Sequence, residues 1–411
     1  MVVLEMCFGN SPESHPLAPT EFRYFDRTRR PWVQALRRAS ARLGFDPLLA
    51  DEHAEAFAAA YFDADPLAEA FVDEIYLTAG PKAGRALLDR ALEQGVAALS
   101  SPPQSLVALV QDFEGDPPWL DRDLVERGAK AFRRYGVDVF HFAGAITLAS
   151  YLEPSVAKPL ILSGGYHGAS TRRRFLETAA FWIEVSEPGG LRLGAAGREA
   201  ILRVRIMHVF ARRRIEQDPG WRRAAWGVPI SQADALLTLM GGSVAPGLAM
   251  HLLGYRTSAD EIRALMHFWR YVGHLMGVRP RWYPATIADA LRLGLLVALK
   301  GTGSAADDGS RLAQAYVEAF ASASREDWRH RASTRLFLPW PIRRRYGLRS
   351  LPNPAPLLLQ APPRLLLEAL RRRSARLDAW IDAHARRRRR RWLQRHLEGP
   401  ARFETTEPTR L

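Results

Sequence analysis

Apolar residues recur every three to four positions through most of the chain, the spacing that places them on one face of an α-helix. The pattern is clear between residues 31 and 100, where Ala54, Phe57, Ala58 and Tyr61 share a face. Alternating apolar and polar positions, which are typical of strands, are scarce. We therefore predict an all-α fold, with one large helical domain over 31–350.

Segments rich in proline and glycine divide this pattern into separate helices. Breaks fall at 100–103, 115–119, 187–190 and 219–220, and 164–168 is predicted as a loop. Asp121 is placed to cap the helix after the second break. The predicted helices are 121–152 (as one or two helices), 170–186, 198–216, 231–240, 246–253, 258–277, 285–299, 309–324 and 362–397.

Two segments at the ends of the chain differ from the helical domain. Residues 1–30 have an irregular pattern, and 351–363 holds five prolines, which predicts a hinge or an extended crossover. A basic helix follows this crossover, so 351–411 forms a separate C-terminal part. The helices therefore extend the central core towards both ends of the chain.

Two apolar stretches indicate burial. Residues 139–152 are apolar nearly all round, which predicts a helix buried on most sides. Residues 235–255 carry no charge and come nearest to the length of a membrane span. Glycines at 241, 242 and 247 and Pro246 interrupt this second stretch, so we predict two short buried helices joined by a turn.

Composition narrows the classes of protein further. One cysteine, Cys7, excludes a disulfide within the chain and a cysteine-rich zinc site, and a thiolate-bound haem is not expected from its place in the irregular N-terminus. The first residues lack the basic and apolar regions of a signal peptide, so a cytoplasmic location is expected. The formal charge of +14 favours acidic partners without showing that one is bound.

A histidine interrupts an apolar helix face. Ile201, Val204, His208, Ala211 and Ile215 fall on one side of the predicted 198–216 helix. One interpretation is a core histidine that bonds to a backbone carbonyl. The other is an axial ligand of haem, which needs an imidazole among apolar neighbours because the porphyrin must be buried.

The preceding helix offers polar groups at helical spacing. Arg174 and Thr178 are four residues apart, and Phe181 and Val185 continue their face. Arg174 could pair with an anionic group such as a haem propionate, and Thr178 could bond to a propionate or to a ligand on iron. Taken alone, they are better explained as a solvated arginine beside a half-buried threonine.

Together these residues resemble a known family. Arg174 and Thr178, then 187–190 (Glu-Pro-Gly-Gly), then Arg205 to Arg212 around His208, resemble the rubber oxygenase or latex-clearing protein family, which includes the mycophenolic-acid side-chain oxygenases. The loop 226–231 (Trp-Gly-Val-Pro-Ile-Ser) and the segment 268–278 are similar to that family as well. The resemblance covers roughly 110–285.

The resemblance implies a fold, a cofactor and site residues. It implies a globin-like helical core around haem b, with His208 as the proximal ligand of the iron. Arg174 and Thr178 would line the cofactor site, and Arg212 would support it from outside the pocket. The activity implied is an O2-dependent oxidation or cleavage of a C=C bond in an apolar, isoprenoid-like substrate.

Two departures from the family leave questions open. Rubber-cleaving members can carry a lysine near the distal iron position, where this chain has Glu177. Glu177 could act as an acid or base if burial raises its pKa, or it could face solvent or pair with Arg173. Glu153 is a second candidate carboxylate. Since no export signal is recognised, a small apolar substrate inside the cell is expected rather than an external polymer.

Other motifs indicate structure rather than chemistry. Gly301-x-Gly303 lacks the strand that precedes a dinucleotide-binding loop, so a connection between helices is predicted. His267 and His274 share a face with Tyr271, but no Glu-x-x-His or His-Glu-x-x-His motif accompanies them, so no di-iron or zinc bundle site is predicted. The Gly-x-Ser-x-Gly nucleophile motif is also absent.

The C-terminal helix leaves a choice of partner. Its leucines and six consecutive arginines at 386–391 could lie on an anionic membrane surface, such as the inner membrane, or the leucines could pack on the core and the arginines face solvent. No motif for specific nucleic-acid binding is present. A non-enzymatic haem-binding or gas-sensing protein is the alternative to an oxygenase, and a membrane-peripheral or nucleic-acid-binding helical protein is a third.

Overall fold

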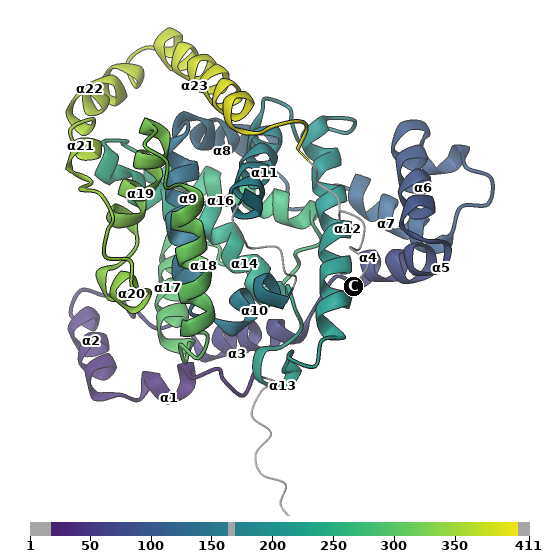
Figure 1. Cartoon of the computed structure of the whole chain (residues 1–411), viewed down its shortest axis with the longest axis horizontal. Helices are drawn as coiled ribbons and strands as arrows, with labels where there is room; N and C mark the ends of the chain where they lie inside the picture. Colours follow the sequence, from purple (N-terminus) through teal and green to yellow (C-terminus); the bar gives the residue numbers. More distant parts are fainter. Residues whose placement is uncertain (1–17, 163–168, 402–411) are drawn as a thin grey trace, which may run out of the picture.

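The computed structural model describes residues 18–162 and 169–401. Within these ranges all regular structure is helical and no strand occurs, which confirms the all-α prediction. Cys7 and the predicted loop 164–168 lie outside the described residues. The helices form one large body with a smaller lobe on one side (Figure 1).

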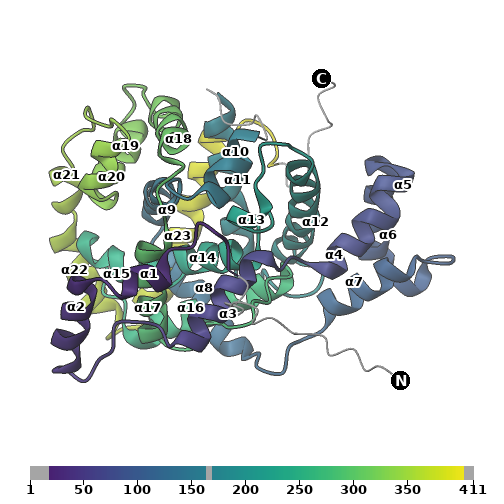
Figure 2. The ribbon, with the colours of Figure 1, turned by 90° about the horizontal axis from the view of Figure 1, so that it is seen from below.

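The N-terminal helices surround one end of the body and build the lobe. Four of them, α4 to α7, project away from the body in two perpendicular views (Figures 1 and 2). The segment expected to be irregular includes one short helix, α1. The elements are α1 (Tyr24–Thr28), α2 (Pro31–Ala41), α3 (Asp51–Ala59), η1 (Ala60–Phe62), α4 (Pro66–Phe71), η2 (Val72–Tyr76), α5 (Leu77–Ala79), α6 (Pro81–Gln94), η3 (Val96–Ala98) and α7 (Gln104–Glu114).

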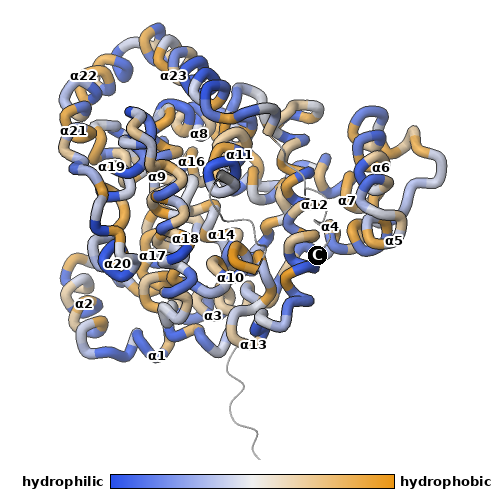
Figure 3. The backbone as a smooth tube through the Cα atoms, viewed as in Figure 1, coloured by the Kyte–Doolittle hydropathy of each residue, from blue (hydrophilic) through white to orange (hydrophobic). Residues whose placement is uncertain are grey.

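The central helices make the core, which buries most of their apolar side chains together with several arginines. Apolar and polar residues alternate along each of these helices (Figure 3). α8 and α16 pack along each other, and Gly128 lies so close to the Ala264 carbonyl that a side chain would overlap it. The elements are α8 (Arg122–Arg134), α9 (Asp138–Ser150), α10 (Pro154–Leu162), α11 (Ala169–Ser186), α12 (Ala196–Glu216), α13 (Arg223–Trp226), α14 (Gln232–Gly242), α15 (Val244–Ala249), η4 (Met250–Leu253), α16 (Ala259–Leu275) and α17 (Ile287–Lys300).

Several local predictions in this region are confirmed. Asp121 caps α8, its side chain accepting the Leu124 N–H at 2.8 Å. α9 is buried on most sides. The chain breaks at Ser243 between α14 and α15, as the glycines predict. By length and apolar composition alone Gln232–Leu253 could cross a membrane, but 56% of its most apolar window is buried within the protein.

The C-terminal helices wrap the outside of the core. They are α18 (Ala306–Ala319), α19 (Arg325–Phe337), α20 (Trp340–Arg345), α21 (Ala355–Leu358), α22 (Ala361–Arg371) and α23 (Ala375–His396). The prediction of one helix over 362–397 is wrong, because Ser374 accepts the Leu377 N–H and starts a new helix. The crossover 351–363 is also not simply extended, since Pro356, Pro362 and Pro363 lie in the first turns of α21 and α22, where the backbone N–H groups have no partner within the helix.

Candidate functional site

The two helices that carry the predicted site residues, α11 and α12, form an antiparallel hairpin (Figure 1). Their backbones touch at the closed end, where a side chain on Gly190 or Gly197 would overlap the Glu184 carbonyl. His208 lies twelve residues beyond the start of α12, and Arg174 lies twelve residues before the end of α11. At 1.5 Å per residue, each lies roughly 18 Å along its own helix from the closed end.

His208 is partly buried on the apolar face of α12. Burial, with a smaller contribution from the Arg212 charge, lowers the pKa of His208 to about 4, so the ring is neutral at pH 7. Among the described residues none hydrogen-bonds to its ring nitrogens, so the interpretation as a core histidine bonded to a carbonyl finds no partner here. An imidazole with an unused lone pair is a competent metal ligand.

Two buried arginines bracket this histidine and fix its helix. The Arg205 guanidinium donates two hydrogen bonds to the Asp65 carboxylate, of 2.6 and 2.9 Å, and a third to Asp112 at 3.0 Å. Asp65 begins α4 and Asp112 belongs to α7, so Arg205 also ties the lobe to α12. Because both carboxylates already neutralise Arg205, its charge is not available to a ligand.

Arg212 holds the loop that follows α12. Its guanidinium donates to the carbonyls of Pro229 and Ile230, at 3.0 and 2.9 Å, and pairs with Glu69 at 2.9 Å. The side chain is 3% exposed, so these bonds occupy it in a dry setting. Arg212 therefore lies where it can position the helix of His208, outside direct reach of a ligand on the apolar face.

The three predicted residues of α11 lie at or near the surface. Arg174 and Thr178 are exposed, and the Thr178 hydroxyl donates to the Arg174 carbonyl at 3.1 Å. Among the described residues no carboxylate pairs with the Arg174 guanidinium. Glu177 is partly buried and pairs with Arg173 at 3.0 Å. The ion pair with Arg173 is one of the arrangements considered for this carboxylate from the sequence.

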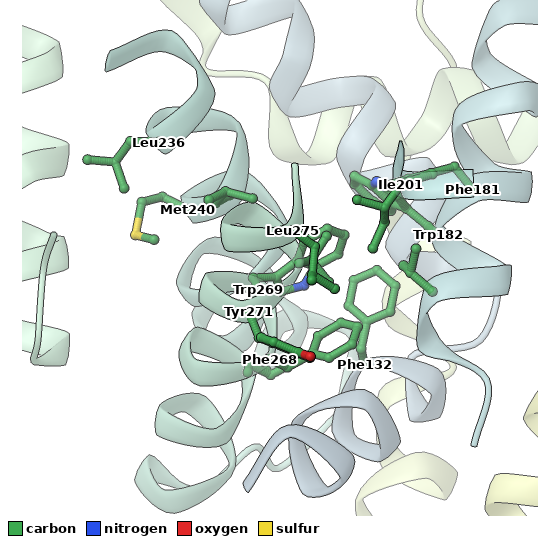
Figure 4. Close-up of a cluster of buried hydrophobic side chains, with 14 of the residues drawn as sticks. Phe132, Phe181, Trp182, Ile201, Leu236, Met240, Phe268, Trp269, Tyr271 and Leu275 are labelled. Carbon is green, nitrogen blue, oxygen red and sulfur yellow. The ribbon is translucent and has the colours of Figure 1, made fainter. Parts of the chain in front are cut away.

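Apolar side chains from several helices gather beside the hairpin (Figure 4). Phe181 and Trp182 come from α11 and Ile201 from α12, and all three are at most 9% exposed. Trp182 packs edge-on against Phe132 and Trp269, with ring centroids 5.5 and 5.4 Å apart, which anchors α11 to α8 and α16. Leu236 and Met240 of α14 extend the apolar surface.

The two further motifs prove to be structural supports. In the 226–231 loop, Gly227 has a φ of +80° and lies against the Tyr61 carbonyl with no room for a side chain. In the 268–278 segment, a side chain on Gly277 would overlap both the Asp65 carboxylate and the Arg205 guanidinium. Both glycines therefore permit the close packing that holds α12 in place.

A buried polar cluster near α14 was missed by sequence reasoning. Asp234 accepts bonds from Ser231 and Ser155, each at 2.9 Å, and burial raises the pKa of Asp234 to about 6. Lys300 lies close by and pairs with Glu153 at 2.7 Å, so Glu153 is already neutralised. Asp234 is the third residue of α14, and Ser231 is the N-cap of this helix. Such a sequence indicates a capped helix start, but it does not indicate that the carboxylate is buried.

The weaker motifs have plain structural explanations. Gly301 and Gly303 lie in the connection between α17 and α18, as predicted, and Gly301 packs against the Glu153 carboxylate. His267 accepts the Asp121 backbone N–H at 3.0 Å. Trp119 lies edge-on to both His267 and His274, with centroids 5.5 and 5.7 Å away.

Comparison with known proteins agrees with the architecture. The family model described as ER-bound oxygenase mpaB/B'/Rubber oxygenase, catalytic domain, matches residues 133–376. This range contains all the motifs above and extends beyond them towards the C-terminus. The chain is 25% identical over 227 residues to the rubber oxygenase of Streptomyces sp. (strain K30), spanning 54% of each protein, so it covers about half the length of that relative.

A solved structure shows the same fold. The latex clearing protein LCP in its closed state superposes with a TM-score of 0.61 at 21% identity, over 82% of this chain and 92% of that one. At this identity the likeness concerns the fold alone. Since the family model covers more than half of the chain, the protein belongs to the family of mpaB/B' and rubber oxygenase catalytic domains.

Proposed function

We propose that the protein is a haem b-dependent oxygenase in which His208 is the protein ligand of the iron. The observation that carries this proposal is the His208 ring, which is neutral, lies on an apolar helix face and has no hydrogen-bond partner among the described residues. Haem iron takes such an imidazole as its axial ligand. Membership of an oxygenase family supports the same class of reaction.

The residues around the hairpin fit this cofactor. Haem b presents two carboxylates and a wide apolar ring. Arg174 offers an exposed guanidinium that no described carboxylate occupies, and Val204 and Ala211, which are partly buried beside His208 on α12, offer apolar contacts. His208 would hold the iron and Arg174 a propionate.

The protein part of the reaction is binding, orientation and exclusion of water. Haem, when bound, supplies the chemistry that activates O2. Arg205 and Arg212 keep α12 rigid, so the His208 ring holds one orientation. Thr178 could donate its hydroxyl proton to a propionate or to an iron-bound ligand. Glu177 could act as an acid or base only after leaving Arg173.

We propose an apolar substrate with a C=C bond, of isoprenoid type, oxidised or cleaved by O2. The aromatic and aliphatic side chains beside the hairpin support an apolar ligand, because they offer few polar groups to a hydrophilic one. The relative from Streptomyces is named a rubber oxygenase. For this chain we propose a small isoprenoid-type substrate and not a polymer.

Turnover under labelled oxygen tests the activity. Haem-loaded protein is incubated with farnesyl, geranylgeranyl and squalene-type isoprenoids under 18O2, and products are analysed by mass spectrometry. Aldehydes or ketones carrying 18O are expected, with none from a His208→Ala variant. A protein that binds haem and O2 but forms no oxygenated product over the whole panel would contradict the oxygenase and support the gas-sensing alternative.

We also propose that α22 contacts an anionic membrane surface. Its apolar side faces outward, with Leu366 62% and Leu370 45% exposed, whereas Glu368 and Arg371 are buried in ion pairs. This exposure of the α22 leucines differs from the alternative raised above, in which the leucines would pack on the core. Exposed Leu252 of η4 lies on the neighbouring element, and exposed arginines at 372, 373 and 376 border α22.

The arginine run of α23 has a different role. Arg386 pairs with Glu187 at 2.8 Å and the buried Arg389 donates to Ser186 at 3.0 Å. These contacts lie at the carboxyl end of α11, where positive charge is favourable to the helix dipole. Arg386 and Arg389 therefore dock α23 on the hairpin, and we propose α22 as the membrane surface.

Vesicle flotation tests the membrane contact. The full chain is expected to float with phosphatidylglycerol vesicles at low salt and less at high salt, since surface charge attraction is screened. Leu366→Glu should lose most of the binding. Leu291→Glu is the matched control, because Leu291 is also exposed, at 48%, but lies on α17. Equal flotation of both variants would contradict the proposal.

A further inference from the structure

A second cluster of potential ligands lies between α9 and α19. His141 of α9 is 2% exposed and His330 of α19 is 1% exposed. Glu326, one turn before His330, approaches both rings, with Oε1 2.7 Å from His141 Nε2 and 3.7 Å from His330 Nε2. The ligand atoms of the three residues lie within 4.8 Å of one another.

A hydrogen-bond network explains only part of this cluster. Glu326 Oε1 accepts from His141 and also from the Trp392 indole N–H, at 2.6 Å. His330 Nε2 is buried and bonds to none of the described residues. At 3.7 Å it is too far from Glu326 for a hydrogen bond. A buried imidazole nitrogen without a partner is costly and calls for an explanation.

The surroundings of His330 favour a lone pair on this nitrogen. The Tyr316 phenol oxygen lies 3.3 Å from His330 Nδ1, and the tautomer in which Nδ1–H donates to this oxygen leaves the lone pair on Nε2. Nε2 then faces the Glu326 carboxylate, and two acceptors that face each other are stabilised by a cation between them. Gly144 gives the Tyr316 hydroxyl its room, because a side chain there would overlap it.

The rings are held in this orientation by packing. Phe320 stacks on the His330 ring with centroids 3.9 Å apart and planes 17° apart. Burial lowers the pKa of His330 well below its ordinary value, so this ring is neutral, which is the form that binds metals. A second-sphere partner on the far nitrogen, as Tyr316 provides, is usual for histidine ligands.

We propose that His141, Glu326 and His330 bind one divalent transition-metal ion, with Zn2+ as the best fit. Two imidazoles and one carboxylate are a common protein ligand set for zinc, with a water or the second carboxylate oxygen completing the tetrahedron. Zinc would replace the His141–Glu326 hydrogen bond, and the neutral His141 ring would bind the ion through Nε2 while its one proton sits on Nδ1. The motif search missed this cluster because Glu326 and His330 are spaced i, i+4, and His141 is remote in sequence.

This ion would lock the outer helices on the core. It would join α9 to α19, and Trp392, which bonds to Glu326, brings α23 to the same place. Phe175, the residue after Arg174 in α11, lies edge-on to His330 with centroids 4.9 Å apart. The proposed ion therefore sits behind α11, and its residues are distinct from His208.

Zinc content of the full-length chain tests the site independently of haem. The purified protein is treated with a chelator, loaded with ZnCl2, desalted and analysed by mass spectrometry for zinc. About one zinc per chain is expected, with nitrogen and oxygen neighbours near 2.0 Å in zinc-edge X-ray absorption. The melting temperature should rise on loading, because binding to the native state alone stabilises it.

Matched variants make the test specific. Glu326→Gln keeps the size of the side chain and an oxygen that accepts from Trp392, so this variant should fold, lose the zinc and show no shift in melting temperature. His330→Gln should behave alike, and His274→Gln should retain zinc. A wild-type chain without zinc after loading, or variants that bind as much as the wild type, would overturn the proposal.

Discussion

At the scale of single residues, the environment of His208 depends on partners that are distant in the sequence. The apolar stripe on 198–216 predicts that this histidine is enclosed by apolar neighbours. Its flanking arginines, 205 and 212, are neutralised by Asp65, Asp112 and Glu69, which lie about 90 to 140 residues away. Periodicity places a residue on a helix face, but it cannot identify the element that covers that face.

Removal of Arg205 should destabilise the fold strongly. In Arg205→Met the buried Asp65 carboxylate loses its cation, and breaking a buried pair in this way costs about 3–5 kcal/mol. Arg205→Met with Asp65→Leu should recover part of that loss. Urea unfolding measures the difference. As a control, Arg263→Met breaks an exposed pair with Asp260 and should cost less than about 1 kcal/mol. Equal losses for the two arginines would contradict this role.

Asp234 should give the stability a distinct pH dependence. Its pKa is raised to about 6 in the native state, against 3.8 as the ordinary value. Between these values the native state binds more protons than the unfolded state, so this group lowers stability as pH rises from 4 to 6. Asp234→Asn removes the effect. The stability of the variant relative to wild type should therefore increase over that window, by up to about 3 kcal/mol, at 1.36 kcal/mol per pKa unit.

Urea unfolding at several pH values between 4 and 7 follows this difference. The relative stability should level off towards pH 7, where most of Asp234 is ionised in both states. Parallel curves for the wild type and the variant over the whole range would show that Asp234 titrates normally.

At the scale of elements, the sequence is informative about where helices begin and end, and less so about their contacts. The Gly-Pro breaks predict the hairpin of α11 and α12, and Asp121 predicts the start of α8. The break at Ser374 is hidden within an arginine-rich stretch that has strong helix propensity. The outward apolar face of α22 was also not predictable, because a pattern does not say which side of a helix is covered.

Two glycine-to-alanine substitutions test whether a glycine is required by close packing, as at Gly227, or is replaceable, as at Gly294. Gly227→Ala would force a side chain into the Tyr61 carbonyl at a φ of +80°, so a loss of stability of about 1–3 kcal/mol is expected. Gly294 lies inside α17 with nothing within 4 Å of an added Cβ. Gly294→Ala should therefore raise stability by about 0.5–1 kcal/mol. Thermal unfolding measures both, and changes of the same sign would contradict this reading.

At the scale of the whole molecule, the net charge of +14 is not simply displayed to solvent. Arg133, Arg198, Arg205 and Arg389 are among the largest fully buried side chains, and most of their charge is matched by distant carboxylates. Composition alone predicts solvated arginine faces. The fold instead uses arginines to join helices, and the exposed side of α22 is apolar and bordered by arginines.

The measurement that most directly tests the central claim is haem binding by a cavity variant of His208. Purified apoprotein is titrated with haemin and followed by its Soret absorption, for the wild type, His208→Gly and His274→Gly. His274 is the matched control, since burial also lowers its pKa to about 4. We predict tight binding by the wild type and the control, weak binding by His208→Gly, and recovery of the wild-type spectrum when imidazole is added. Wild-type affinity and an unchanged spectrum in His208→Gly would contradict the assignment.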